Sequence, residues 1–416
     1  MTTIIPLLQK TQAAAAKVRQ LSDAQRSAIL NYLAKIVEQS VSEIMFENQK
    51  DLDLMDKADS KHDRLLLTEN RIQSLADSLR EVALLPDPTG EVLVERNLAN
   101  GLNIKKLSVP MGVVGVIYES RPNVTIDVAS LCLRSGNACV LKGGKEAIFS
   151  NTCLVGLIHQ ALAKFGIADE AVLLLPSDRK FTEELLQATR YVDIIIPRGS
   201  DALIQFVRKN SLIPTIETGA GVVHTYVEQS ADLAKAKEII VNARVSRPSV
   251  CNSLDCAIID VAIIEIFLPM LIEDFEKWNV EIYADEACYA VFKKNGYKKL
   301  HKAQAEDFGR EWLDYKISFK TVQNIDEALA HIQAFSSRHS EAILTENSVI
   351  AEKFLTEVDA AAVYHNASTR FTDGGMFGLG AEIGISTQKL HARGPFALEK
   401  LVTEKWVILG DGQVRW

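Results

Sequence analysis

The chain has 416 residues, of which 47% are hydrophobic, and a formal net charge of −8 at pH 7. Such a chain can bury the cores of two or three domains. Its acidic balance argues against general nucleic-acid binding, which needs clustered basic side chains. No apolar run reaches the roughly 18 residues of a membrane span, and residues 1–6 lack the basic flank of a signal peptide. We therefore expect a cytoplasmic protein with neither membrane nor nucleic-acid partners.

The first part of the chain, residues 6–85, repeats apolar side chains at helical spacing and offers a capping box at residues 22–25. Turn residues at 86–90 end this helical segment. Strands are predicted next at 102–109 and 113–118. Short apolar strands then alternate with helices, at 138–141, 151–165, 171–175, 182–188, 192–196 and 201–209. This alternation is typical of a parallel sheet covered by helices.

A second unit of the same class is predicted from residue 257 onward. Its strands are expected at 257–259, 281–283, 317–321, 342–344 and 361–364, and its helices at 263–278 and 326–335. The polar stretch 287–313 is expected to form surface insertions. Residues 401–409 favour an exposed strand or hairpin, and a long apolar terminal strand aggregates unless something covers its edge. We therefore expect the chain to assemble through residues 401–409 together with 102–109.

The six cysteines form no C-x-x-C pair and have no metal-ligand spacing with the eight histidines, which favours free thiols and no metal site. One of them, Cys251, follows a helical pattern at 231–244 and lies on a connection rather than in an apolar run. Arg244 and Arg247 are near it in the sequence, and positive charge lowers the pKa of a thiol. Cys251 is therefore a candidate nucleophile. The alternative is that it is a small buried hydrophobic residue.

Two predicted strands run into glycine-containing loops that could bind a nucleotide. The strand at 138–141 leads into Lys142, Gly143, Gly144 and Lys145, and the strand at 192–196 leads to Gly199 and Ser200 at the start of a helix. Glycines allow close backbone approach, and cations suit phosphate or ribose oxygens. Neither loop has the G-x-G-x-x-G pattern, so an ordinary turn is an equally good interpretation of each.

Two further stretches carry polar groups that suit an anionic substrate. Asn123 and Arg121 follow the strand at 113–118, where the amide could donate to an oxyanion and the guanidinium could bind a carboxylate or phosphate. A simple turn explains them comparably well. Residues 366–382 are rich in hydroxyls and glycines and lack hydrophobic periodicity, which is typical of a functional loop. Its candidate substrate-binding residues are Ser368, Thr369 and Arg370.

Together these stretches resemble the γ-glutamyl phosphate reductase family of the aldehyde dehydrogenase superfamily. The matching runs are 109–113, 118–125, 247–252, 366–382 and 386–395, with a further signature at 322–343 in which Phe335 replaces the usual His or Tyr. The resemblance implies an α/β fold with two Rossmann-like parallel-sheet domains and a β-strand oligomerisation arm. It implies an NADPH-binding domain at 1–238 with an arm strand near 100–110, a catalytic domain at 239–365 and a return at 366–416. That return would carry the substrate loop and the C-terminal arm.

The resemblance also implies roles for single residues. Cys251 would be the nucleophile and Asn123 the oxyanion donor. Lys142 would bind the adenosine ribose, with Lys145 favouring a 2′-phosphate, and Glu311 would hold the ribose on the nicotinamide side. Glu217 falls where the superfamily has a deacylating base, which these reductases do not generally keep.

The implied activity is NADPH-dependent reduction of L-glutamyl 5-phosphate to L-glutamate 5-semialdehyde with release of phosphate, the second step of proline biosynthesis. It would run through a thioester on Cys251, in a homo-oligomer that could receive its substrate from glutamate 5-kinase. From the residues alone two other classes stay open. One is a cofactor-free cysteine acyltransferase or hydrolase, which saturable NADPH fluorescence changes would separate from the reductase. The other is a catalytically silent scaffold.

Overall fold

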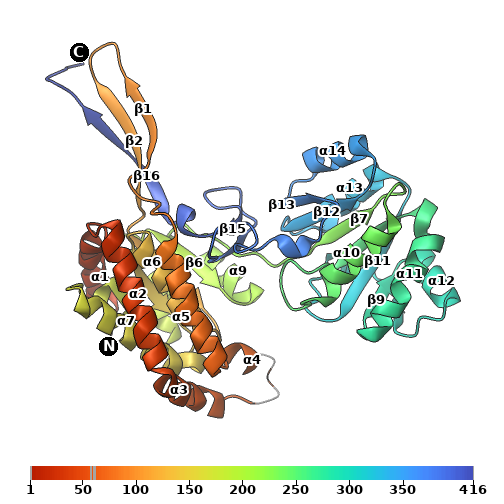
Figure 1. Ribbon diagram of the computed structural model, residues 1–416, viewed down its shortest axis with the longest axis horizontal. Coiled ribbons are helices and arrows are strands. Elements are labelled where there is room, and N and C mark those ends of the chain that lie inside the picture. Colours follow the sequence, from red (N-terminus) through yellow and green to blue (C-terminus); the bar gives the residue numbers. More distant parts are fainter. Residues whose placement is uncertain (1, 57–58, 60–61, 416) are drawn as a thin grey trace. The chain divides into compact units, whose positions relative to one another are not determined.

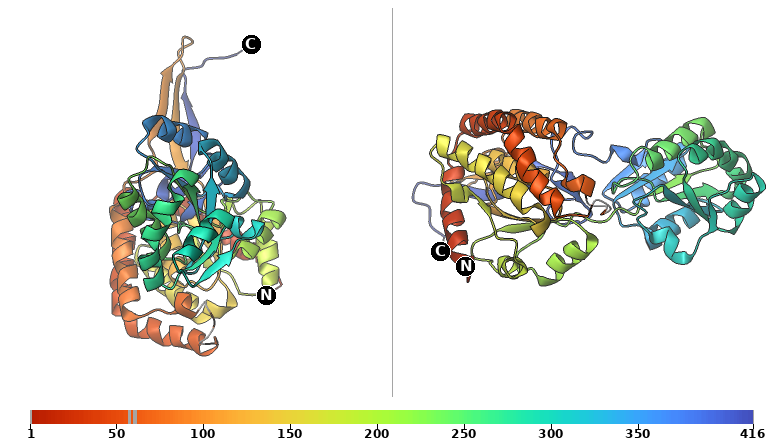
Figure 2. Two further views of the ribbon diagram at one scale, coloured as in Figure 1. Left: turned by 90° about the vertical axis from the view of Figure 1, so that its right-hand side faces the viewer. Right: turned by 90° about the horizontal axis from the view of Figure 1, so that it is seen from below.

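The computed structural model describes residues 2–56, 59 and 62–415 and divides the chain into two compact units (Figures 1 and 2). Unit 1 contains Met1–Thr218, Gly378–Gly384 and Phe396–Trp416, and unit 2 contains Gly219–Phe377 and Ile385–Pro395. Each unit has its own parallel sheet, which confirms the predicted α/β class. The functional division at residues 238 and 365 stays a prediction.

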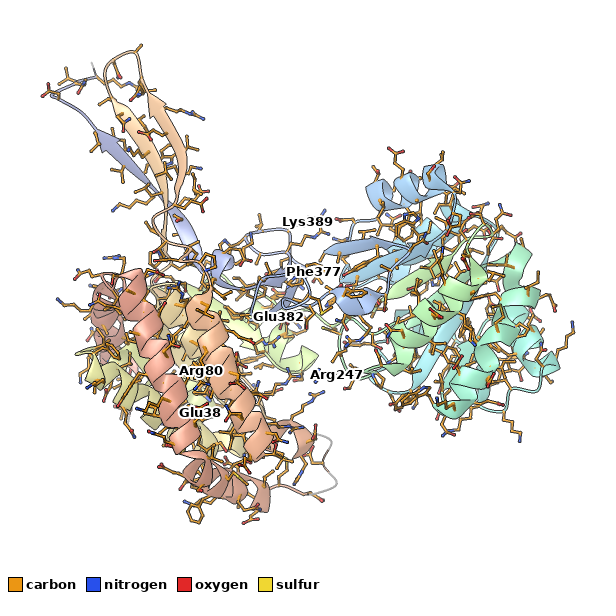
Figure 3. All side chains as sticks on the ribbon, in the orientation of Figure 1. Glu38, Arg80, Arg247, Phe377, Glu382 and Lys389 are labelled. Atoms are coloured by element: carbon orange, nitrogen blue, oxygen red, sulfur yellow. The ribbon has the colours of Figure 1, made fainter. Side chains whose placement is uncertain are left out.

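Unit 1 begins with helices, as predicted: α1 (Ile5–Val18), α2 (Asp23–Gln39), α3 (Val41–Asp53), α4 (His62–Leu65) and α5 (Glu69–Leu84). The capping box before α2 is present, because Ser22 accepts from the Gln25 N–H and the Gln25 side chain accepts from the Ser22 N–H. Helices α2 and α5 pack side by side, and the Arg80 guanidinium lies 2.6 Å from the Glu38 carboxylate between them (Figure 3).

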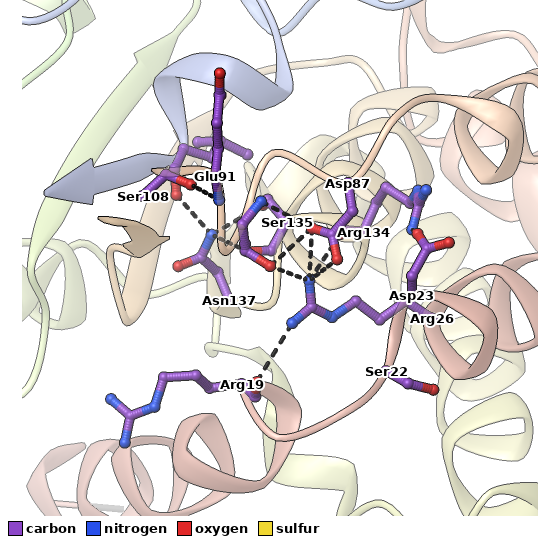
Figure 4. A network of polar contacts seen from close by, with 12 residues as sticks. Arg19, Ser22, Asp23, Arg26, Asp87, Glu91, Ser108, Arg134, Ser135 and Asn137 are labelled. Atoms are coloured by element: carbon purple, nitrogen blue, oxygen red, sulfur yellow. Dashed lines mark hydrogen bonds and ion pairs between the residues drawn. The ribbon is translucent and has the colours of Figure 1, made fainter. Parts of the chain in front are cut away.

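A polar network fastens these helices to α6 (Asn123–Arg134), the helix that begins with Asn123 (Figure 4). The buried Arg26 guanidinium of α2 lies 3.1 Å from the Asp87 carboxylate and also donates to the Arg134 carbonyl. The Arg134 side chain in turn pairs with Asp23. A buried cation needs such partners, because desolvation alone would cost several kcal/mol. The network therefore fixes α6 against the helical layer.

The sheet of unit 1 has the strand order β5-β4-β3-β6, and all of its pairings are parallel. Its elements are β3 (Val113–Tyr118), β4 (Ala138–Lys142), β5 (Val172–Leu174) and β6 (Ile194–Arg198), with α7 (Ile148–Lys164), α8 (Arg179–Leu186) and α9 (Asp201–Asn210). Helix α6 was not predicted, since residues 119–123 were interpreted as either a polar site or a turn and no helix was placed after them. Nearly all of its side chains are buried. The helical pattern was nevertheless present in the sequence, because polar residues recur at the spacing of one helix face, namely Asn123, Asp127, Ser130 and Arg134.

The arm is an antiparallel sheet of β1 (Val92–Asn97), β2 (Asn103–Pro110) and β16 (Val402–Leu409) (Figure 1). Strand β16 pairs with β2 along its whole length, which confirms both predicted strands, whereas β1 was missed. At the base of the arm, the Asn137 amide donates to the Leu401 carbonyl at 2.9 Å. Farther out, Trp406 and Ile408 are 48% and 53% exposed. Assembly through this arm stays a prediction.

Unit 2 contains a seven-stranded sheet of order β10-β9-β11-β8-β7-β12-β13, parallel throughout. Its strands are β7 (His224–Val227), β8 (Cys256–Asp260), β9 (Glu281–Ala284), β10 (Leu300–Lys302), β11 (Lys316–Val322), β12 (Ser340–Leu344) and β13 (Ala362–His365). Its helices are α10 (Leu233–Val245), α11 (Ile264–Lys277), α12 (Glu286–Lys294), α13 (Ile325–Phe335) and α14 (Ser348–Glu357). Two short strands, β14 (Gly384–Ser386) and β15 (Gly394–Phe396), pair with each other.

The expectation of surface insertions at 287–313 was wrong. This stretch contains most of α12 and the edge strand β10, and Cys288, Val291 and Phe292 are buried in the core. These three side chains share one helix face, but the many lysines around them lower the average hydropathy of the stretch and hide the pattern.

Among the described residues, no helix combines the length and the apolar character needed to cross a bilayer.

Candidate active site

The carboxyl ends of three adjacent strands in unit 1 bring most of the predicted cofactor residues to one edge of the sheet. Ile117 of β3 pairs with Lys142 of β4, and Tyr118 pairs with Arg198 of β6. The loops that follow these strands, at 119–123, 143–147 and 199–200, therefore begin side by side. In open α/β sheets this edge is where ligands bind.

Lys142 and Gly143 form a cradle that suits a polar ligand. Lys142 is only 5% exposed, and its ammonium donates to the Gly143 and Ser177 carbonyls at 3.3 and 3.0 Å. Burial lowers its pKa, against the attraction of Glu146 and Asp178. A Cβ on Gly143 would lie 2.3 Å from Asn151 Nδ2, a buried donor with no hydrogen-bond partner among the described residues. The cradle thus fits a nucleotide's ribose or phosphate oxygens.

The second glycine loop is arranged differently. The Ser200 N–H, at the start of α9, donates to the Glu119 carboxylate at 2.9 Å, and Ser200 Oγ caps the helix at Leu203. A phosphate at Gly199 and Ser200 would therefore have to displace Glu119. Lys145 is exposed at the start of a 3₁₀ turn. The residues at this edge fit a cofactor at Lys142 and Gly143 directly, and at α9 only after Glu119 has moved.

The loop between β3 and α6 holds Arg121 and Asn123 in a constrained backbone. Ser120 has a φ of 42°, a region that few non-glycine residues adopt. Its N–H and hydroxyl both donate to Glu146 Oε1, at 2.7 and 2.8 Å. Asn123 then begins α6, and its Nδ2 donates to Asp127 Oδ2 at 3.0 Å. Ser120, Glu146 and Asp127 were all missed from the sequence.

Comparison of the six free cysteines selects Cys251 as the candidate nucleophile. Cys132, Cys139, Cys256 and Cys288 are fully buried, and burial raises the pKa of Cys256 and Cys288. Cys153 is partly exposed, but burial and then Glu43 and Glu47 raise its pKa to about 11. Cys251 is partly exposed and lies between α10 and β8, on the connection that the sequence predicted.

The Cys251 loop is held by its backbone. A Cβ on Gly221 would lie 1.7 Å from the Cys251 carbonyl oxygen, so only glycine lets the two segments approach this closely. The Gly221 N–H in turn donates to Glu311 Oε1 at 3.0 Å. Arg244 donates to the Pro248 carbonyl at 2.7 Å and lies 3.0 Å from the Asp255 carboxylate. Arg244 therefore supports the loop, and its charge is balanced by Asp255.

The predicted substrate loop is tied to the Cys251 loop through Asn252. The Asn252 side-chain amide donates to the backbone carbonyls of Arg370 and Thr372, at 3.3 and 2.8 Å. The backbone carbonyl of Asn252 accepts from the Thr369 hydroxyl at 2.9 Å. Thr369 is fully buried. Ser368 is also buried, and its hydroxyl donates to Asn242 Oδ1 at 2.8 Å. Both hydroxyls thus bond to the protein itself.

Arg370 brings positive charge to Cys251. Burial and the nearby Arg247 lower the pKa of Arg370, while Asp373 and Cys251 raise it. Arg370 is therefore a cation close enough to Cys251 for their charges to interact. Arg370 Nε also donates to Ser246 Oγ at 3.1 Å. Of the three residues predicted from this loop, Arg370 is the one whose charge reaches the thiol.

Two other groups of ionisable side chains make contacts within their own units. Glu217, the position of the superfamily's base, lies 3.8 Å from Arg208 in unit 1. In the core of unit 2, ligand atoms of His224, Cys256 and His331 lie within 4.8 Å of one another, a grouping that sequence spacing could not reveal. His224 Nδ1 also lies 3.2 Å from the Glu341 carboxylate. We interpret this buried cluster as part of the packing.

Comparisons with known proteins point to one family and together cover nearly all of the chain. The sequence model described as "Aldehyde dehydrogenase family" matches residues 3–309. A γ-glutamyl phosphate reductase of Legionella pneumophila (strain Corby) is 55% identical over 98% of this chain and 98% of its own length. One of Chlorobaculum parvum is 52% identical over 99% of this chain and 98% of its own. The crystal structure of γ-glutamyl phosphate reductase from Thermotoga maritima has a TM-score of 0.95 and 40% identity, covering 99% of this chain and 100% of that one.

Proposed function

Since the chain belongs to the aldehyde dehydrogenase family, and within it to the γ-glutamyl phosphate reductases, we propose that it reduces L-glutamyl 5-phosphate to L-glutamate 5-semialdehyde with NADPH. Membership itself implies a step of proline biosynthesis. The observation that carries the finer proposal is the Cys251 loop, where a partly exposed thiol lies under the influence of Arg370.

Cys251 acts as the nucleophile in this proposal. Its thiolate attacks the acyl carbon of the substrate, the carbon–oxygen bond to phosphate breaks, and a thioester remains on the sulfur. Asn123 and the Cys251 N–H donate to the oxyanion that forms during the attack. Arg370 favours the thiolate and has the charge that an anionic acyl phosphate requires, with Arg121 as a further cation for the substrate.

The chain's residues would hold a nicotinamide cofactor at the unit 1 edge. Lys142, Gly143 and Gly144 receive the adenosine side, and Lys145 adds a cation that favours a 2′-phosphate. Gly199 and Ser200 receive the pyrophosphate once Glu119 has moved, and Glu311 is proposed for the second ribose. When bound, the cofactor supplies the hydride that reduces the thioester to the aldehyde level. The Cys251 sulfur then leaves as a thiolate.

We extend the proposal to the setting of the enzyme. Six free cysteines suit the reducing cytoplasm. The exposed apolar side chains of the arm suit a homo-oligomer. We also include direct transfer of the acyl phosphate from glutamate 5-kinase, because an acyl phosphate is labile in water.

The reverse reaction tests the proposal. Purified protein with glutamate 5-semialdehyde should reduce NADP⁺ only when inorganic phosphate is present, because phosphate must release the acyl group from Cys251. Cys153→Ser is the matched control, since it removes the other partly exposed thiol and should leave the rate unchanged. If the protein bound no NADPH and formed product without phosphate, it would instead be a cofactor-free acyltransferase or hydrolase.

A further inference from the structure

Asn123 and Asp127 lie one helical turn apart at the start of α6, on the same face of the helix. The Asn123 Nδ2 donates to Asp127 Oδ2 at 3.0 Å. Within the described part of the chain, the Asn123 side chain makes no other hydrogen bond. Its orientation therefore depends on Asp127.

The charge state of Asp127 determines which end of the amide faces it. Burial raises the pKa of Asp127 to about 6, against the hydrogen bond from Asn123 and the charge of Arg198 on β6, which lower it. At neutral pH the side chain is mainly a carboxylate, which only accepts hydrogen bonds. The amide nitrogen must then face Asp127. That nitrogen has a second N–H, and an oxyanion requires such a donor.

The helix that carries both residues is held firmly. Within the helix, the Ser130 hydroxyl donates to the Asp127 backbone carbonyl at 2.8 Å, a bond that does not involve the Asp127 carboxylate and does not anchor the helix to its neighbours. At the other end of α6, Arg134 pairs with Asp23 and donates to the Leu85 carbonyl. A donor supported in this way loses little freedom when substrate binds.

We propose that Asp127 is a positioning residue, which orients the Asn123 amide so that its nitrogen rather than its oxygen is presented to the acyl oxygen of the substrate. The inference rests on the proposed function, in which Asn123 is the oxyanion donor. Asp127 itself touches neither substrate nor cofactor in this scheme.

A double-mutant cycle in turnover tests this role. Asp127→Ala alone should lower kcat between about tenfold and about a hundredfold, the scale expected when a catalytic group is misplaced, with little change in the KM for either substrate. In an Asn123→Ala background, Asp127→Ala should lower kcat by less than about twofold, because the group that Asp127 orients is gone. Asp127→Asn, which keeps an acceptor oxygen, should recover part of the loss.

Ser130→Ala is the matched control, because it removes a bond to the Asp127 backbone without altering the carboxylate, and its kcat should match the wild type. Thermal unfolding of each variant identifies a temperature at which all are folded. If Asp127→Ala does not fold, the same cycle is run with Asp127→Asn. Equal losses of kcat in the wild-type and Asn123→Ala backgrounds would overturn the inference. Wild-type turnover in Asn123→Ala would overturn the oxyanion role instead, and with it this part of the proposed function.

Discussion

The carboxyl edge of the unit 1 sheet and the Cys251 loop of unit 2 place their residues by different means. At the edge, Lys142 ends β4 and is positioned by the parallel ladder, whereas Asn123 begins α6 after the loop that follows β3. Around Cys251, the partners Gly221 and Arg370 come from distant parts of the sequence and are held by backbone contacts and hydrogen bonds. The edge therefore depends on strand ends and a helix start, whereas the loop is an assembly of segments that are distant in the sequence.

The largest loss of turnover is expected from a substitution in the Cys251 loop. Cys251→Ser should lower turnover by at least about a thousandfold, the scale of losing a nucleophile that works with its neighbours. A hydroxyl without an adjacent base is a far poorer nucleophile than a thiolate. Initial rates in the phosphate-dependent reaction measure this, with NADPH fluorescence to show that cofactor binding survives. Turnover near the wild-type level would remove Cys251 from the mechanism.

The next effect lies at the edge. Asn123→Ala should lower kcat by between about a hundredfold and about a thousandfold, as removal of an oxyanion donor does. The KM values should change much less, because the hydrogen bond strengthens only as the oxyanion forms. Steady-state kinetics separates the two constants. A rise in KM with unchanged kcat would show that Asn123 serves ground-state binding.

Gly221→Ala probes the assembly without touching a reacting group. Its new Cβ would overlap the Cys251 carbonyl, so the loop must shift, and we expect a loss in kcat of about a hundredfold, as for a misplaced nucleophile. Gly156→Ala is the control, since a Cβ there meets nothing within 4 Å inside helix α7. The rate at which iodoacetamide alkylates Cys251 gives a second measurement of whether the loop has shifted. Unchanged kinetics in Gly221→Ala would mean that the loop tolerates displacement.

The smallest effect is expected from the cations at the edge. Replacement of both Lys142 and Lys145 by Ala should raise the KM for NADPH at least about tenfold, the scale of a lost charged hydrogen bond. The KM for NADH should rise much less, since NADH lacks the 2′-phosphate. Parallel measurements with both cofactors test this. Equal increases would assign the lysines to the shared part of the two molecules.

The same contrast explains what the sequence could reveal. Strand-end residues such as Lys142 were found because a short apolar run followed by glycine is visible locally. Asp127 was missed because no helix was predicted at 123–134, and without the helix its spacing from Asn123 has no meaning. The hydrogen bond between Gly221 and Glu311 joins segments far apart in the sequence, so no local pattern predicts it. The glycines before the apolar run do indicate a close backbone approach. The Glu311 side chain was predicted for a cofactor and is observed on a backbone N–H.

The pairing of β16 with β2 has a consequence for synthesis of the chain. Unit 1 is discontinuous, and its arm lacks β16 until residues 402–409 have left the ribosome. Most of unit 2 is continuous, from Gly219 to Phe377, so it has nearly all of its strands well before that moment. Non-local pairing is slow because the intervening loop must first close. We therefore expect nascent chains to carry a folded unit 2 and an unfinished unit 1, whose arm is completed only when β16 pairs with β2.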